Sequence, residues 1–243
     1  MAILITKSDL ALVQSPYFCE MDVPQNASGQ EKKTEKAVDL FDKYALEYEG
    51  RHMDMALYQD SLDTFCEWLP SPDASVLDLA CGPGNVTFYL LQKLPGLKAL
   101  GLDLSPEMLT LARKNNPQAQ FRLMDVRKIG DLEQQFSGII AGFVSPYLDE
   151  SDTAQLISSA FALLLPGGAF YLSTMAAGNE GSGWKASHSS QGDEVDIFYH
   201  EADFLLEIAQ KAGFINLELS QQAFPEEDGS DTTDLILLAR KPY

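Results

Sequence analysis

The most informative segment of this chain of 243 residues is Ser75-Val76-Leu77-Asp78-Leu79-Ala80-Cys81-Gly82-Pro83-Gly84. Its first half is a short apolar run typical of a buried strand, and its second half is a glycine-rich turn. Residues 86–94 then follow a helical pattern, so the segment predicts a strand, a tight turn and a helix. Glycines in such a turn allow a ligand to lie against bare backbone, beside the unpaired N–H groups of a helix N-terminus. A tight turn that binds nothing is the alternative interpretation.

Strands and helices alternate along the rest of the chain. Further strands are predicted at 98–104, 120–124, 138–144 and 169–174, with helices that begin near Ser105 and span 86–94, 151–165 and 201–212. This alternation predicts a mostly parallel sheet that is covered on both faces. The last two strands, at about 214–223 and 233–240, have no helix between them and are expected to form an antiparallel hairpin. The fold class is therefore α/β, with a doubly wound sheet of seven strands.

The N-terminal part of the chain has a different pattern. Residues 1–30 end in a loop-like composition and are expected to be an extension, either mobile or packed on the domain or on another subunit. Residues 31–70 carry apolar side chains at helical spacing. We expect residues 31–243 to form a single domain, in which the glycine- and serine-rich insertion at 176–199 serves as a substrate cap.

Composition excludes several classes of protein. The chain has 17 Lys and Arg against 36 Asp and Glu, a net charge of −19, which disfavours nucleic acid and anionic membranes as partners. Three widely spaced cysteines, without a paired motif, indicate neither a disulfide framework nor a metal site. No apolar run approaches the length of a membrane helix, and no signal peptide is evident. We therefore expect a cytoplasmic protein with no metal, and with an oligomeric state, monomer or homodimer, that the sequence leaves open.

Acidic residues follow the next two predicted strands. Asp103 comes 19 residues after Gly84, which is close to the spacing at which a carboxylate binds ribose hydroxyls. A helix-capping role is the alternative for Asp103. Asp125 is followed by Val126, a pair suited to an exocyclic amine and to the face of a flat base, with Leu104 on the other face. The tripeptide after Gly84 contains no third glycine, and this disfavours NAD.

Four motifs in this order resemble the class I S-adenosylmethionine-dependent methyltransferases, over about residues 36–240. The motifs are Val76–Gly84, Gly101–Leu109, Asp125-Val126 and Leu164–Gly168. The resemblance implies a Rossmann-like sheet with an N-terminal helical lid at 31–70, and S-adenosylmethionine as cofactor. It also implies methyl transfer to a small molecule at an O, N or C atom. The alternative is an inactive protein of the same fold that binds a nucleoside-type metabolite or a protein partner.

The resemblance also implies the residues of a cofactor site. The turn after the first strand would face the methionine part, Asp103 the ribose, and Asp125 with Val126 the adenine. Lid residues such as Tyr44 and Tyr48 would close over the cofactor, although core packing explains both tyrosines equally well. The implied cofactor-binding residues are Asp78, Ala80, Gly82, Gly84, Asp103, Leu104, Met108, Asp125, Val126, Gly142, Phe143, Tyr44 and Arg51.

The sequence indicates less about the residues that would bind the methyl acceptor than about those that would bind the cofactor. Methyl transfer is a displacement that depends mainly on positioning, and a general base is needed only if the nucleophile must lose a proton. Tyr147, His188 and His200 are the candidates for that base, each with a plain hydrogen-bonding role as the alternative. Ser145-Pro146-Tyr147 departs from the Asn/Asp-Pro-Pro-Tyr motif of base-amine methyltransferases, because the Asn or Asp is missing. This departure, with the net charge, argues against a nucleic-acid acceptor.

Overall fold

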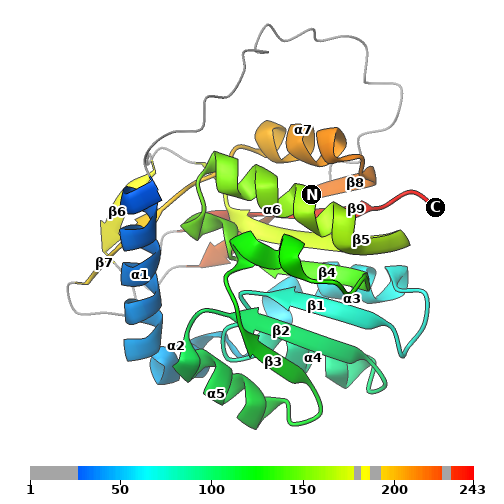
Figure 1. Ribbon diagram of the computed structural model, residues 1–243, viewed down its shortest axis with the longest axis horizontal. Coiled ribbons are helices and arrows are strands. Elements are labelled where there is room, and N and C mark those ends of the chain that lie inside the picture. The colour runs from blue at the N-terminus through cyan, green and yellow to red at the C-terminus, as the bar shows by residue number, and fades with distance from the viewer. Residues whose placement is uncertain (1–26, 178–181, 187–192, 226–230) are drawn as a thin grey trace, which may run out of the picture.

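The core of the protein is a seven-stranded sheet, which a computed structural model shows with helices on both faces (Figure 1). The structure describes residues 27–177, 182–186, 193–225 and 231–243. The strands of the sheet are β1 (Ser75–Leu79), β2 (Lys98–Asp103), β3 (Gln120–Leu123), β4 (Phe136–Gly142), β5 (Leu164–Met175), β8 (Ile215–Pro225) and β9 (Asp231–Arg240). Their order is β3-β2-β1-β4-β5-β9-β8, and β9 runs antiparallel to both of its neighbours. The predicted parallel sheet with a terminal antiparallel hairpin is confirmed.

Two groups of helices cover this sheet, and a further set stands at one end of it. The longer helices are α1 (Ala27–Lys43), α2 (Ala45–His52), α3 (Gln59–Trp68), α4 (Asn85–Lys93), α5 (Pro106–Asn115), α6 (Glu150–Leu163) and α7 (Ala202–Ala212). Short 3₁₀ turns are η2 (Ala56–Tyr58), η3 (Val126–Asp131) and η4 (Ser145–Tyr147). In Figure 1, α6 and α7 lie over one face, α3 and α4 under the other, and α1 stands at the side.

Successive side chains of each central strand point to opposite faces of the sheet and are buried on both. Ile139 packs in the cluster under α6 and α7, whereas Ile140, the next residue, packs against Leu62 and Phe65 of α3, and all four are fully buried. Burial of this kind stabilises by about 25 cal/mol per Å² of apolar surface. Because both faces are covered, the central strands are continuous apolar runs, as parallel strands usually are.

Local signals in the sequence explain where helices begin and end. Ser105 caps α5, since its side chain accepts the Met108 N–H at 3.0 Å, and Pro106 takes the first helical position, as the sequence predicts. Gly213 ends α7 in the left-handed conformation, with φ of 105°. These caps fix the lengths of the loops at the two ends of the sheet.

The order of the strands reverses at β1, and this reversal predicts where a ligand-binding crevice lies. Strand β2 pairs with one side of β1 and β4 with the other, both in parallel. In open α/β sheets, ligands bind outside the carboxyl ends of the strands at such a switch point. Here the carboxyl ends of β1, β2 and β4 are Leu79, Asp103 and Gly142.

The structure differs from the sequence-based expectations in one boundary, in the packing of one helix and in one additional pair of strands. Helix α1 begins at Ala27, so Ser28 and Gly29 lie within it and the predicted extension at 1–30 is too long; residues 1–26 lie outside the described part of the chain. Helix α3, predicted as part of a lid, instead packs on the sheet, because its apolar face meets the apolar face of the strands. The described residues of the insertion at 176–199 include two paired strands, β6 (Gly183–Ala186) and β7 (Glu194–Ile197).

In the described residues, no helix is both long and apolar enough to cross a membrane.

Candidate active site

The turn between β1 and α4 is held in an unusual backbone conformation. Ala80, Gly82 and Gly84 have φ of 53°, 51° and 78°, in the left-handed region. Alanine pays about 1–2 kcal/mol for this conformation, whereas glycine adopts it freely. A Cβ at Gly84 would lie 2.4 Å from Asn116 Nδ2, so Gly84 is required for packing against α5. A Cβ at Gly82 would have its nearest neighbour at 3.7 Å, on the ring of Tyr48. Gly82 therefore presents its bare backbone towards the open side.

Asp103, at the end of β2, fixes this turn. Its Oδ2 accepts the Gly82 N–H at 2.8 Å and its Oδ1 accepts the Ser105 N–H at 2.8 Å. Burial raises the pKa of the Asp103 carboxyl, and the backbone hydrogen bonds from Ser105 and Gly82 oppose that rise. Each carboxylate oxygen keeps a second lone pair, so the group can still accept hydrogen bonds from a ligand.

Asp78 lies beneath the turn. The residue is 1% exposed, and its Oδ2 accepts the hydroxyl of Thr87 on α4 at 2.6 Å. Burial raises its pKa to about 7, against the lowering effect of the hydrogen bonds from Thr87. Asp78 is therefore a group that braces the turn from below, and it does not line the cavity.

Asp125 and Arg127 form a paired wall after β3. Arg127 donates from Nε to both carboxylate oxygens at 3.0 Å and from Nη2 to Oδ2 at 2.6 Å. Burial acts to raise the pKa of Asp125, but the hydrogen bonds from Arg127 lower it below its usual value. Val126 lies between these two residues and its side chain lines the same cavity. The result is an anionic acceptor beside an apolar surface.

The end of β4 forms the next wall. Phe143 has φ of 53°, and its N–H donates to the Ser173 carbonyl oxygen at 3.0 Å. The Phe143 ring meets the Tyr58 ring edge-on, with 5.4 Å between centroids. Tyr58 in turn donates its hydroxyl to the buried carboxylate of Asp234 at 2.7 Å. This chain of contacts holds the Phe143 ring at the cavity.

A cover closes the open side; we define it as α1 together with the β6–β7 hairpin. Its two parts share an apolar cluster of Ala37 and Leu40 with Val195 and Ile197. Ion pairs join them at the edges, and the first is Lys33 Nζ to Asp196 Oδ2 at 2.6 Å.

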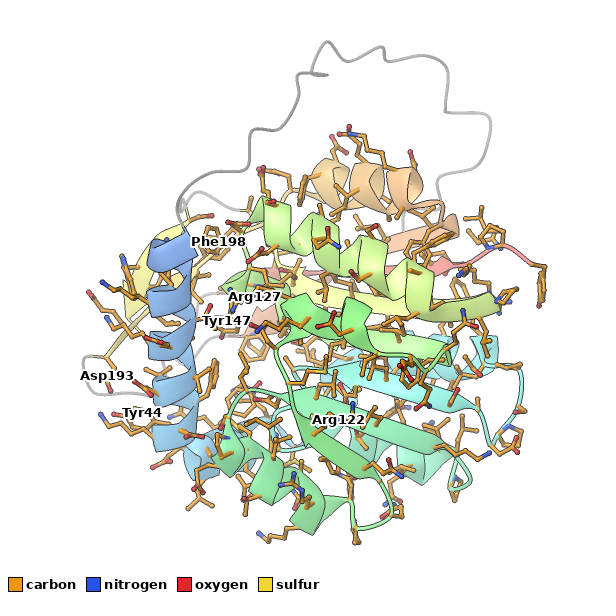
Figure 2. The ribbon with its side chains drawn as sticks, viewed as in Figure 1. Tyr44, Arg122, Arg127, Tyr147, Asp193 and Phe198 are labelled. Carbon is orange, nitrogen blue, oxygen red and sulfur yellow. The ribbon has the colours of Figure 1, made fainter. Side chains whose placement is uncertain are left out.

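At the other end of α1, the side chains of Lys43 and Tyr44 donate to Asp193 Oδ2 at 2.8 and 3.0 Å. Figure 2 shows Tyr44 and Asp193 on this outer side, and Arg127 and Tyr147 between α1 and the sheet. Asp42 of α1 also accepts hydrogen bonds from the Ser105 hydroxyl and the Glu107 N–H, at the start of α5. Polar contacts thus join the two parts of the cover to each other, and Asp42 attaches α1 to the start of α5.

These walls enclose a cavity of about 780 Å³, part of which is open to solvent. The residues that line it are Thr34, Ala37, Val38, Phe41, Tyr48, Ala80, Gly82, Asp103, Leu104, Met108, Met124, Asp125, Val126, Arg127, Gly142, Phe143, Val144, Tyr147 and Leu148.

The structure brings most of the sequence-predicted cofactor residues to this one cavity. Those that line it are Ala80, Gly82, Asp103, Leu104, Met108, Asp125, Val126, Gly142 and Phe143. Asp78 and Gly84 instead shape the turn from behind. Tyr44 points to Asp193 on the hairpin, and Arg51 is exposed on α2, so neither lines the cavity.

The three candidate bases have different positions. Tyr147 lines the cavity, and burial, with a smaller effect of Tyr48, raises its pKa well above the usual value, so its hydroxyl stays protonated. His200 is 1% exposed, and its Nε2 lies 2.9 Å from the Ser145 carbonyl oxygen, behind η4 and outside the lining. His188 lies outside the described residues. Of the three, Tyr147 alone is placed at the described cavity, where it can donate a hydrogen bond but is poorly suited to remove a proton.

Sequence reasoning missed part of the lining. Thr34, Val38 and Phe41 come from α1, whose position over the cavity depends on contacts with a distant hairpin. Arg127 was also missed, although it follows Asp125 by two residues and forms a bidentate pair with it. An acidic residue with an arginine two positions on, directly after a strand, was the signal available.

Comparison with known proteins identifies a domain in the chain. Residues 76–168 match the family model described as "Methyltransferase domain". A trans-aconitate 2-methyltransferase of Variovorax paradoxus is 40% identical over 101 residues, which are 41% of this chain and 38% of that protein. A demethylmenaquinone methyltransferase of Chlorobaculum parvum is 36% identical over 100 residues, 41% of this chain and 40% of that protein. The chain thus matches well under half the length of each of these relatives.

Two solved structures are similar over most of the chain. The 1,6-didemethyltoxoflavin-N1-methyltransferase of Burkholderia thailandensis, solved with its substrate and S-adenosylhomocysteine, has a TM-score of 0.66 at 22% identity. The similarity covers 92% of this chain and 94% of that one. Magnesium protoporphyrin IX methyltransferase of Synechocystis, solved with S-adenosylmethionine, has a TM-score of 0.62 at 17% identity, over 92% of this chain and 100% of that one. At these identities the similarity establishes the fold.

Proposed function

Since residues 76–168 form a class I S-adenosylmethionine-dependent methyltransferase domain, we propose that this protein binds S-adenosylmethionine in the cavity and transfers its methyl group to a small-molecule acceptor. The observation that carries the proposal is the Asp103 carboxylate, which holds the Gly82 turn and lines the cavity beside it. A carboxylate at this strand end is suited to the two hydroxyls of a ribose.

The residues that line the cavity offer a suitable contact to each part of this cofactor. The left-handed turn at Ala80 and Gly82 leaves bare backbone for the amino-acid part. Val126 and Leu104 supply apolar surface for a flat base, and Asp125 supplies an acceptor for an amine. When bound, the cofactor supplies an electrophilic methyl group on a positively charged sulfur.

The residues of this chain would act by positioning and by excluding water. Phe41 of α1, which is part of the cover, and Tyr147 of η4 both line the cavity, and their rings meet edge-on. Holding two reactants in line can contribute about 7–11 kcal/mol to lowering a barrier. Tyr147, which stays protonated, would donate a hydrogen bond to an oxygen or nitrogen of the acceptor. We assign no general base among the described residues that line the cavity.

Ligand-induced stabilisation tests the cofactor assignment. S-adenosylhomocysteine at 100 times its dissociation constant should stabilise the protein by about 2.7 kcal/mol. For a chain of this size, that free energy raises the melting temperature by about 5–10 °C. NAD at the same concentration is the control and should produce no shift. A shift with NAD alone, or with neither ligand, would refute the assignment.

Activity is a separate measurement. S-adenosylhomocysteine should form from S-adenosylmethionine in the presence of a suitable acceptor, and not in its absence. A protein that binds the cofactor product but yields no turnover with a broad set of acceptors would support the inactive, ligand-binding alternative.

A further inference from the structure

Charged side chains in the cavity are few, and the one cation among them is already paired. Among the described lining residues, these are the carboxylates of Asp103 and Asp125 and the guanidinium of Arg127. Arg127 forms a bidentate pair with Asp125, and its Nη1 lies 3.8 Å from Asp152 Oδ2. Two carboxylates and one guanidinium give the lining a formal charge of −1. This balance suits a ligand with excess positive charge, as S-adenosylmethionine has.

Other cations near the cavity are engaged elsewhere. Lys33 and Lys43 of α1 pair with Asp196 and Asp193 of the cover, at 2.6 and 2.8 Å. Arg122 is exposed on β3 and lies apart from Arg127 and Tyr147 (Figure 2). An acceptor carboxylate would therefore find no unpaired cation among the described lining residues, whereas the carboxylate of the cofactor is accompanied by an ammonium group in the same molecule. Burying such a charge without a partner is strongly unfavourable.

The walls that remain for an acceptor are aromatic and aliphatic. Phe41 meets Tyr147 edge-on at 5.2 Å between centroids, and meets Tyr48 edge-on at 5.7 Å. Phe143, just after β4, also lines the cavity, and Val38 adds aliphatic surface from α1. Rings arranged in this way favour a flat aromatic partner, which can stack on one ring and meet another edge-on.

We propose that the acceptor is a planar aromatic molecule without carboxylate groups, received by Val38, Phe41, Phe143 and Tyr147. This inference rests on the proposed function, because it assumes that the cofactor occupies the turn and the Asp125 wall. It separates this protein from the trans-aconitate methyltransferases among its relatives, since trans-aconitate is a tricarboxylate. Polycarboxylates are thereby excluded as acceptors.

A matched pair of probes tests the inference. 2-Naphthol and 6-hydroxy-2-naphthoate share a ring system and a hydroxyl and differ by one carboxylate. Their affinities are measured by calorimetry on protein saturated with S-adenosylhomocysteine, with trans-aconitate as the third probe. We expect 2-naphthol to bind at least about tenfold more tightly than the naphthoate. Trans-aconitate should show no binding at millimolar concentration.

A lysine introduced at Val38, in the lining of the cavity, should reverse the preference for 2-naphthol over 6-hydroxy-2-naphthoate. Val38→Lys should favour the naphthoate over 2-naphthol, whereas Val38→Met, a matched control of similar length, should retain the wild-type order. Binding of S-adenosylhomocysteine by each variant shows that it is folded. Equal or tighter binding of either carboxylate by the wild-type protein, or no binding of 2-naphthol at millimolar concentration, would overturn the inference and leave the cofactor assignment standing. Failure of S-adenosylhomocysteine itself to bind would instead refute the proposed function.

Discussion

Replacing Asp103 with asparagine tests the link between the turn and the cofactor site. Asp103 accepts two backbone N–H groups, from Gly82 and Ser105, each at 2.8 Å. Asparagine has the same shape but keeps one oxygen, and its NH₂ group must face one of the two N–H donors. The variant therefore loses one hydrogen bond to a charged acceptor and sets two donors against each other.

The structure gives the scale of the loss. A hydrogen bond to a charged group contributes about 1.5–3 kcal/mol, and an unsatisfied buried donor costs about as much. We expect Asp103→Asn to lower the free energy of unfolding by about 2–3 kcal/mol, or about 5–10 °C in melting temperature. Affinity for S-adenosylhomocysteine should fall by about 100-fold, since the turn and the ribose acceptor change together.

Calorimetric titration with S-adenosylhomocysteine measures the affinity, and thermal unfolding measures the stability. Asp131→Asn is the matched control, because Asp131 is exposed and does not line the cavity. That control should bind with wild-type affinity. If Asp103→Asn bound S-adenosylhomocysteine within about threefold of the wild-type protein, the role of this carboxylate would be refuted.

Three further predictions concern residues that support the site from behind its lining. Tyr58→Phe removes the hydroxyl that donates to the buried Asp234 and should lower the free energy of unfolding, measured in urea, by about 1.5–3 kcal/mol. Tyr89→Phe removes a donor to the more exposed Asp63 and should lower it by less than about 1 kcal/mol. Equal losses in the two variants would contradict this prediction. Burial raises the Asp78 pKa from an ordinary 3.8 to about 7, so the contribution of Asp78 to the free energy of unfolding should fall between about pH 4 and pH 7 and be constant above that. Urea unfolding should therefore find that the stability of the wild-type protein relative to Asp78→Asn falls over this pH range. A relative stability that does not change with pH would contradict the pKa shift. Asp196→Asn breaks the ion pair with Lys33 of α1. Backbone amide hydrogen exchange should become faster in α1 and stay unchanged in β4. Unchanged exchange in α1 would show that this ion pair does not hold the two parts of the cover together.

The fold could be predicted because its signals are local. The apolar run 75–79, the turn that follows it and the cap at Ser105 each depend on neighbouring residues alone. The missing helix between the last two strands predicted the antiparallel hairpin in the same way. The strand pair β6–β7 was missed because its two short strands lie at the ends of a glycine- and serine-rich stretch, and because its apolar residues pack on α1. Nothing in the local sequence indicates that contact.

The site was predictable where the sheet positions the residues. Asp103, Asp125 and Gly142 lie at or just after strand ends, and the topology brings strand ends together. Residues on helices were harder, because periodicity defines which face is apolar but does not define what that face meets. Tyr44 follows Phe41 by only three residues, just after α1 ends at Lys43, yet Phe41 lines the cavity and Tyr44 contacts Asp193 beside β7.

A crystal structure of the protein with S-adenosylhomocysteine tests the central claim most directly. The account predicts one molecule in the cavity, with its ribose hydroxyls within hydrogen-bond distance of Asp103 and its adenine between Leu104 and Val126. The amino-acid part should lie along the backbone of Gly82. A ligand bound elsewhere, or a cavity that stays empty at saturating concentration, would contradict the account.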